Sequence, residues 1–386
     1  SLNFDGTGYN VAVGYDAGVN VTTGVQNTLM GSLAGDALTT GSENVALGYA
    51  ALSSEDAHGQ NVAVGHNALA TLNAGANGLN TAVGYFAGLN MSTGIKNTIV
   101  GALAGDALTT GGENTAVGYA ALSTEDAHGR NVAVGGNALR DLNAGANALN
   151  TAVGYDAGLL MTTGVRNVVI GGLAGDAMTS ATDNVVLGYD AGGAMISAQQ
   201  NTAVGAYAAD AITSGTANVA LGYNALTASV DGDFNTALGY KALEDYEDGD
   251  GNGHNTAVGS KSQLNASTGE FNTALGSLSM GLGVTTGDHN TVLGYNSGVS
   301  LTSGSENMLL GSFAGDAITT GTRNVAIGYA ALSSEDGNGL NTAIGYQALK
   351  TQNAGANAEN VAVGYNAGQA VTTGVQNTIV GSNAGD

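Results

Sequence analysis

Residues 10–43 read NVAVGYDAGVNVTTGVQ followed by NTLMGSLAGDALTTGSE, two segments of equal length that open in the same way. Each segment begins with Asn, continues with a short apolar run and reaches Gly at its fifth position. This motif returns along the chain, most often every 17 residues, as far as NTIVG at Asn377. So short a period, repeated so often, is typical of a solenoid in which each coil stacks on the next.

A longer period lies above the coils. Asn10, Asn80 and Asn150 follow one another at intervals of 70 residues, so four coils make one super-repeat. We read residues 1–386 as one continuous repeat array, with two regular super-repeats at 10–149, irregular ones with an insertion at 150–289, and a regular one plus partial coils at 290–386. Because the last residues repeat an internal motif, we expect the chain to be a fragment of a longer protein.

The local pattern favours strands over helices. Each coil has three or four strand-compatible residues, then Gly, then a turn rich in Gly, Thr, Ser, Asp and Asn. Ala is frequent, but the Gly at the fifth position and at most corners opposes a helix. We therefore predict an all-β fold, a parallel β-solenoid or β-roll of about 17-residue coils. With ~4.8 Å between strands, its 21 complete coils would span roughly 100 Å.

Three positions of the coil, counted from its Asn, have predicted structural roles. The Asn amide should bond the same Asn in the neighbouring coil, and the fifth-position Gly should allow a bend or a positive φ. The bulky aliphatic fourth residue is predicted to form the core. The residues chosen are Asn10, Asn27, Asn44, Asn61, Asn80 and Asn97 for the ladder, Gly14, Gly31 and Gly48 for the bend, and Val13, Met30, Leu47, Val64, Val83 and Val100 for the core.

The slender core has a consequence for assembly. So few large apolar residues in each coil predict a single rod with an exposed apolar stripe. Joining copies along an axis would bury that stripe, which supports an oligomer without fixing the number three.

The composition narrows the class of partner. The formal net charge is −23, from 31 acidic and 8 basic residues. This argues against nucleic acid, which is bound through Lys and Arg, and against anionic membrane surfaces. No apolar run approaches the length of a membrane span, so no membrane insertion is expected in this segment. The chain has no Cys, so disulfides and thiolate metal sites are excluded.

Two acidic features are candidate cation sites, and no other cofactor is predicted. Asp248, Asp250 and Asn252 match the first half of a Ca²⁺ loop, D-x-D-x-N-G, although Gly259 stands where the closing Glu belongs. The alternative is a solvated acidic turn. Acidic corners recur in third coils as weaker candidates. They are Glu55-Asp56, Glu125-Asp126 and Glu335-Asp336, and the equivalent His58 and His128 mark a structural corner.

Nothing in the sequence selects an enzyme. There is no Cys, no recurring His pair at metal-ligand spacing and no nucleophilic Ser elbow, so we predict a non-enzymatic protein. A minor alternative is ice binding by a regular Thr array. It would begin at Thr22-Thr23, Thr39-Thr40 and Thr109-Thr110 and is interrupted in the third and fourth coils.

The motifs NTAVGY, NVALGY and NTALGY with TTG turns resemble two kinds of repeat. These are the head repeats of trimeric autotransporter adhesins and the arrays of phage tail-fibre-like proteins. The resemblance covers nearly the whole chain from Asn10 onward. It implies a trimeric, left-handed parallel β-roll on a cell or virion surface, which attaches to a surface or host receptor.

The chain departs from those families in two respects. Its coil is longer than the usual adhesin head coil, and neither a membrane anchor nor a C-terminal chaperone stands in this sequence. The function expected is the shaft or head of an extracellular attachment fibre, with the receptor left unidentified. The alternative is a purely structural filament or sheath subunit that assembles end to end.

Overall fold

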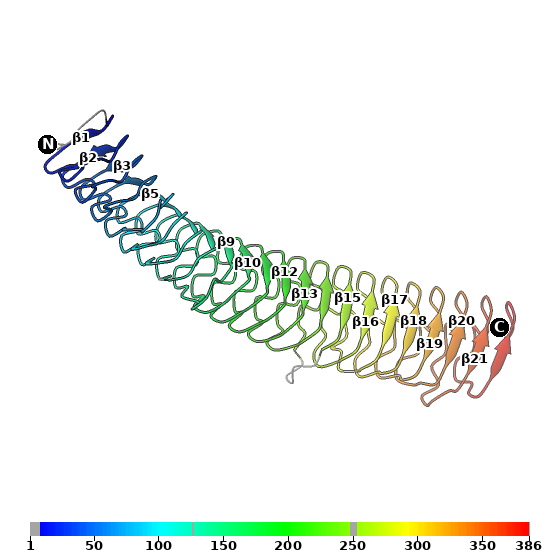
Figure 1. Ribbon diagram of the computed structural model, residues 1–386. Coiled ribbons are helices and arrows are strands. Elements are labelled where there is room, and N and C mark those ends of the chain that lie inside the picture. Colours follow the sequence, from blue (N-terminus) through cyan, green and yellow to red (C-terminus); the bar gives the residue numbers. More distant parts are fainter. Residues whose placement is uncertain (1–7, 126, 248–252, 386) are drawn as a thin grey trace. The chain divides into compact units, whose positions relative to one another are not determined.

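A computed structural model describes residues 8–125, 127–247 and 253–385. These residues contain 22 strands of three residues each and no helix (Figure 1). Each strand is formed by the second to fourth residues of one coil, as the repeat predicts. The strands are β1 (Val11–Val13), β2 (Thr28–Met30), β3 (Val45–Leu47), β4 (Val62–Val64), β5 (Thr81–Val83), β6 (Thr98–Val100), β7 (Thr115–Val117), β8 (Val132–Val134), β9 (Thr151–Val153), β10 (Val168–Ile170), β11 (Val185–Leu187), β12 (Thr202–Val204), β13 (Val219–Leu221), β14 (Thr236–Leu238), β15 (Thr256–Val258), β16 (Thr273–Leu275), β17 (Thr291–Leu293), β18 (Met308–Leu310), β19 (Val325–Ile327), β20 (Thr342–Ile344), β21 (Val361–Val363) and β22 (Thr378–Val380).

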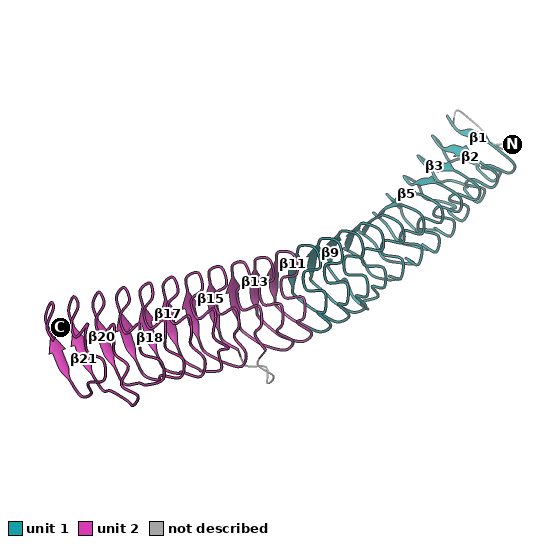
Figure 2. Ribbon diagram, turned by 180° about the vertical axis from the view of Figure 1, so that it is seen from behind, with its two compact units in different colours: residues 1–197 teal, residues 198–386 magenta. Residues whose placement is uncertain are grey.

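The chain divides into two compact units, Ser1–Ser197 with β1 to β11 and Ala198–Asp386 with β12 to β22 (Figure 2). Within each unit every strand pairs in parallel with the next strand of the sequence. The pairing is in register, so that Leu29 lies opposite Ala46 and Ala220 opposite Ala237. The predicted parallel β-solenoid with coils of about 17 residues is therefore confirmed, with about 21 turns in all.

The Asn ladder is also confirmed. The Asn27 backbone N–H donates to Asn10 Oδ1 at 2.8 Å, and the Asn44 N–H donates to Asn27 Oδ1 at 3.0 Å. The Asn27 side-chain Nδ2 donates to the Gly41 carbonyl at 2.9 Å, which ties the start of one coil to the corner of the same coil. Asn27 and Asn44 are fully buried, and the ladder satisfies polar groups that would otherwise be costly to bury. The same backbone-to-side-chain bond continues at Asn61 (3.0 Å), Asn80 (3.2 Å) and Asn97 (2.9 Å).

The fifth-position Gly has the predicted positive φ. The φ angles of Gly14, Gly31 and Gly48 are 140°, 133° and 142°. A Cβ on Gly31 would lie 2.3 Å from the Gly48 carbonyl oxygen of the next coil. Two requirements, the dihedral angle and the close approach of stacked backbones, therefore select Gly here.

The predicted core is wrong, because the fourth residue points outward. Val13, Met30 and Val83 are 53%, 47% and 36% exposed. Leu47, Val64 and Val100, the other residues chosen, are only half-buried. Successive side chains of a strand alternate between its two faces, so the buried first-position Asn places the third residue inward and the fourth outward. The third residue is accordingly buried at Leu29, Ala46, Ala63, Ala82 and Ile99.

Large side chains at the ninth or twelfth position fill the interior. Coils with Gly at the ninth position carry a buried large residue at the twelfth, as Gly35 and Leu38 show. A Cβ on Gly35 would lie 2.8 Å from Leu38 Cδ1, so Gly leaves room for the large side chain at the twelfth position. Third coils instead place a buried Leu at the ninth position, as at Leu52 and Leu122.

Candidate functional site

The described residues enclose no pocket, so the candidate sites are surfaces and corners. One surface, here called the outer sheet face, consists of the first and third residue of every strand, which are the second and fourth residues of the coil. None of the 22 strands has a charged residue at either position; they carry Thr, Val or Met and then Val, Leu, Ile or Met. The exposed apolar members are Val11, Val13, Met30, Val83, Val168, Val185 and Leu187 in the first unit and Val219, Leu221, Leu238, Leu275, Leu293, Met308, Val361 and Val380 in the second.

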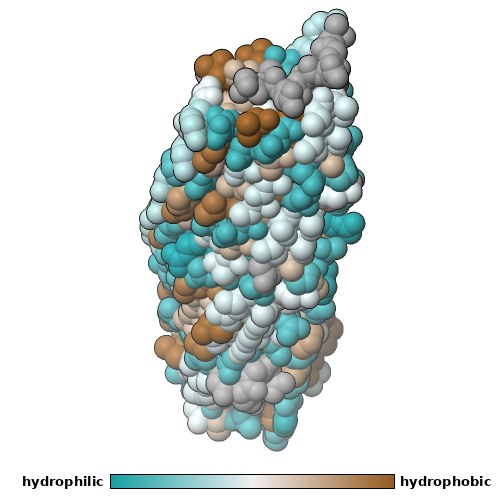
Figure 3. Space-filling model, turned by 60° about the vertical axis from the view of Figure 1, so that its left-hand side comes forward, coloured by the Kyte–Doolittle hydropathy of each residue, from teal (hydrophilic) through white to brown (hydrophobic). Residues whose placement is uncertain are grey.

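A file of aromatic rings follows the sheet two residues further along the coil. The sixth position is most often Tyr, and these Tyr side chains are exposed. Rings in consecutive coils stack, with centroids 5.3 Å apart for Tyr329 and Tyr346 and 5.1 Å apart for Tyr49 and His66. On the side that Figure 3 shows, hydrophobic residues recur in patches among hydrophilic ones. The Tyr file widens the apolar surface and adds hydroxyl groups to it.

Charges gather elsewhere, notably at the last residue of the coil. Glu113 lies 2.9 Å from the Arg130 Nε and 3.7 Å from the Lys96 Nζ, each in a neighbouring coil. The Arg130 hydrogen bond and charge lower the pKa of Glu113. The Arg323 Nε lies 2.8 Å from Glu306 Oε2 in the second unit. Because these pairs are exposed, they stabilise the fold little.

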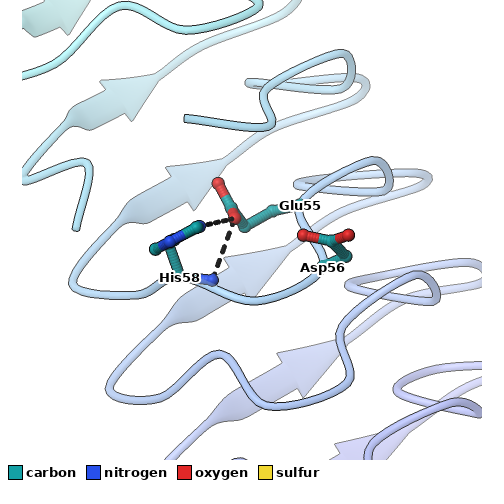
Figure 4. Close-up of side chains that lie close together, drawn as sticks. All are labelled: Glu55, Asp56 and His58. Carbon is teal, nitrogen blue, oxygen red and sulfur yellow. Dashed lines mark hydrogen bonds and ion pairs between the residues drawn. The ribbon is translucent and has the colours of Figure 1, made fainter. Parts of the chain in front are cut away.

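The acidic corner of the third coil places a carboxylate inside the solenoid. Glu55 stands at the twelfth position, where Leu38 and Met91 fill the interior of other coils, and it is fully buried. Its Oε1 accepts the His58 backbone N–H at 3.1 Å (Figure 4). Its Oε2 accepts the Ala74 N–H of the next coil at 3.2 Å. Burial in the interior raises the pKa of Glu55 despite these bonds.

The corner recurs with small changes. Glu125 and Glu335 are also fully buried, and burial raises the pKa of Glu335. His58 Nδ1 lies 3.7 Å from Glu55 Oε1, and His128 Nδ1 lies 3.5 Å from Glu125 Oε1. In the Glu335 corner the residue in place of His is Asn338, whose backbone N–H donates to Glu335 Oε1 at 3.1 Å.

The structure thus brings together one of the predicted acidic pairs, Glu55 and Asp56, with His58. One ligand atom from each of the three residues lies within 4.8 Å of the other two. Glu335 and Asp336 also form a described corner. Asp126 and the predicted Ca²⁺ residues Asp248, Asp250 and Asn252 lie outside the described residues.

Thr22, Thr39, Thr40 and Thr110 of the predicted Thr array use their hydroxyl groups within the fold. Thr22 Oγ1 donates to the Thr39 carbonyl at 3.1 Å, and Thr39 Oγ1 donates to the Asp56 carbonyl at 2.9 Å. These bonds connect consecutive coils. They favour a structural role for the Thr corner, and we do not propose ice binding there.

The fold defines the class of the protein, a parallel β-solenoid repeat protein. No protein-family model matches the sequence, and no curated protein matches it. Among the described residues there is no helix long and apolar enough to cross a membrane. The outer sheet face and the acidic corner are the two features of the fold that bear on function.

Proposed function

We propose that this chain forms the shaft or head of an extracellular attachment fibre, in which copies of the chain pack together through the outer sheet face. The observation that carries the proposal is the absence of charge from that face in a chain with 31 acidic residues and a net charge of −23. Exposed apolar surface that continues over many strands is typical of an interaction site. No catalytic role is proposed.

Electrostatics favour a second copy as the occupant. Acidic copies repel one another at long range, and burying any unpaired carboxylate between them would be costly. The outer sheet face is where two copies can touch without burying a charged group. The partner that fits it is also uncharged and apolar, and the same face of another copy meets that description.

The size of the face is adequate for association. With ~4.8 Å between strands and ~3.3 Å per residue, 11 strands and the files at the second, fourth and sixth positions cover about 50 by 13 Å, or roughly 700 Å² in each unit. A stable protein interface buries about 800 Å² on each partner. Each unit by itself therefore offers an area close to what one partner buries in a standard interface.

The finer features of the proposal come from the resemblance of the NTAVGY motifs to adhesin heads and tail-fibre arrays. They are a homotrimer, a left-handed roll, a location on a cell or virion surface, and attachment to a surface or receptor. In a trimer around one axis each outer sheet face meets two neighbours. That arrangement buries both the aliphatic files and the Tyr file beside them.

Sedimentation of paired variants tests the assembly. The double variant Leu221→Glu, Leu238→Glu places two carboxylates on the outer sheet face, where these residues are 43% and 38% exposed. The matched control is Leu282→Glu, at a residue 60% exposed that lies outside the strands. We expect wild type and control to sediment as trimers and the double variant as a monomer. A monodisperse wild-type monomer contradicts the proposal.

Electron microscopy and surface labelling test the role as a fibre. Rods of a single length support a fibre module, whereas filaments that lengthen with protein concentration support the alternative of a structural filament joined end to end. Antibody labelling of intact cells or particles of the source tests the location. Label seen only after lysis would contradict an extracellular fibre.

A further inference from the structure

We propose that the corner formed by Glu55, Asp56 and His58 binds a divalent transition-metal ion such as Zn²⁺. This goes beyond the role of the solenoid as a fibre, and it stands or falls independently of it. The ligand set is one imidazole nitrogen and two carboxylates, which suits zinc and its neighbours in the first transition series.

The distance between imidazole and carboxylate is the first argument. At 3.7 Å, His58 Nδ1 and Glu55 Oε1 are too far apart for a hydrogen bond, which needs about 2.7–3.2 Å. Two ligands of one tetrahedral Zn²⁺, each about 2.0–2.2 Å from the metal, lie roughly 3.4 Å apart. A shift of a few tenths of an ångström would therefore let both atoms bind one ion.

The state of the two side chains is the second argument. His58 Nδ1 is buried and has no hydrogen-bond partner among the described residues, although it faces a carboxylate (Figure 4). Each Glu55 oxygen accepts one backbone N–H, and each carboxylate oxygen has a second lone pair for a metal. Asp56 is exposed and the His58 side chain is 31% exposed, so an ion can enter from solvent.

The position of the carboxylate is the third argument. Packing alone would place Leu or Met at the twelfth position, as in most neighbouring coils, and a buried carboxylate there carries a desolvation cost. Two backbone hydrogen bonds offset part of that cost. A bound cation would offset the rest, and the negative charge of the chain would attract it.

Recurrence is the fourth argument and supplies an internal control. His128 Nδ1 is likewise buried without a hydrogen-bond partner and lies 3.5 Å from Glu125 Oε1, which repeats the pair one super-repeat later. Asn338 replaces the imidazole in the third corner. We therefore expect metal binding at two corners of the chain and not at the third.

Cobalt and zinc titrations test the site. The full chain is freed of metal with a chelator and titrated with Co²⁺ in excess Ca²⁺, with visible absorption as the readout, and then with Zn²⁺. Wild type should bind two Co²⁺ ions that Zn²⁺ displaces. His58→Gln should bind one, and His58→Gln combined with His128→Gln none, while Asn338→His should gain a third.

The control is His66→Gln, at an exposed imidazole whose ring stacks on Tyr49. It should leave two ions bound, and circular dichroism of the metal-free variants should match wild type. If wild type binds no Co²⁺, or if the double His variant binds as much as wild type, the metal site is refuted. If the corner is purely structural, wild type will bind no Co²⁺ and Asn338→His will gain no metal site.

Discussion

Replacing one Asn in the middle of the ladder should open the solenoid locally. We consider Asn97→Ala in the first unit. The Asn97 Oδ1 accepts the Asn114 backbone N–H at 2.9 Å, and its Nδ2 donates to the Gly111 carbonyl at 2.9 Å. Asn97 is 1% exposed, so water does not reach these groups. Alanine removes both bonds and leaves the Asn114 N–H and the Gly111 carbonyl without partners.

The magnitude follows from those two groups. A buried polar group left without a partner costs about 1–3 kcal/mol, so the pair should lower the free energy of local unfolding by roughly 4 kcal/mol. The matched control is Asn20→Ala, whose Nδ2 donates to the Asp36 carbonyl at 2.7 Å on the surface. Water can replace that bond, so the control should lose about 0.5–1 kcal/mol.

Native-state hydrogen exchange measures this effect where it occurs, which avoids assuming that a repeat array unfolds in one step. A loss of about 4 kcal/mol corresponds to roughly a thousandfold faster exchange at the Asn114 amide. Asn97→Asp adds a sharper test, because it keeps the acceptor but replaces the donor with a carboxylate that faces the Gly111 carbonyl. The protection factor of the Asn114 amide in this variant, corrected for the intrinsic pH dependence of exchange, should rise when acid protonates the carboxylate. If Asn97→Ala behaves like Asn20→Ala, the ladder does not stabilise the fold as argued.

Two further predictions concern glycine and pH. Gly101→Ala should cost roughly 4 kcal/mol or more, because its φ is 137° and a Cβ would lie 2.2 Å from the Gly118 oxygen. Gly75→Ala, with a φ of 65° and nothing within 4 Å, should cost only about 1–2 kcal/mol in thermal or denaturant unfolding. Burial raises the pKa of Glu335 above its ordinary 4.5, so its stabilising contribution is full below that value and is lost as pH rises through the folded-state pKa. As pH falls from 7 to 5, the melting temperature of wild type should therefore rise relative to that of Glu335→Gln. In the control comparison with Glu306→Gln, wild type should show no such rise, since Arg323 lowers the pKa of Glu306. If the difference in melting temperature between wild type and Glu335→Gln does not change with pH, the raised pKa of Glu335 is contradicted.

The period of the chain predicted the strands closely, because Asn and Gly meet strict requirements. The side chain must both accept and donate, as that of Asn27 does: its Oδ1 accepts the Asn44 backbone N–H and its Nδ2 donates to the Gly41 carbonyl. Only Gly fits the close approach between Gly31 and Gly48. Because such requirements repeat at fixed spacing, they can be recognised in a sequence.

The direction of the side chains was harder to predict, because residue size does not determine burial in so narrow a coil. Val13 and Met30 are larger than Ala46 and Ala63, yet the smaller pair lies inside. The signal that could have corrected this is the alternation of strand side chains, given a buried Asn at the first position.

The acidic corner could be predicted only in part. Glu55 is the twelfth residue counted from Asn44, as Leu38 is the twelfth counted from Asn27. This shared position indicates that the carboxylate points inward. The approach of His58 to Glu55 depends on how the polar corner turns, and Gly, Ser, Asp and Asn permit many turn geometries. Neither residue type nor spacing fixes that distance.

The uniform register of the coils has a consequence for how such a chain can change length. Within the regular super-repeats, removal or duplication of 70 residues would return each side chain to an equivalent neighbour, with Asn on Asn and with the buried Glu55 and Glu125 four coils apart. Removal of a single 17-residue coil would keep the backbone pairing but bring ninth-position Leu and twelfth-position Leu side chains into new combinations. The four-coil block, rather than the coil, is therefore the natural increment by which a gene for this protein could grow or shrink without repacking its interior.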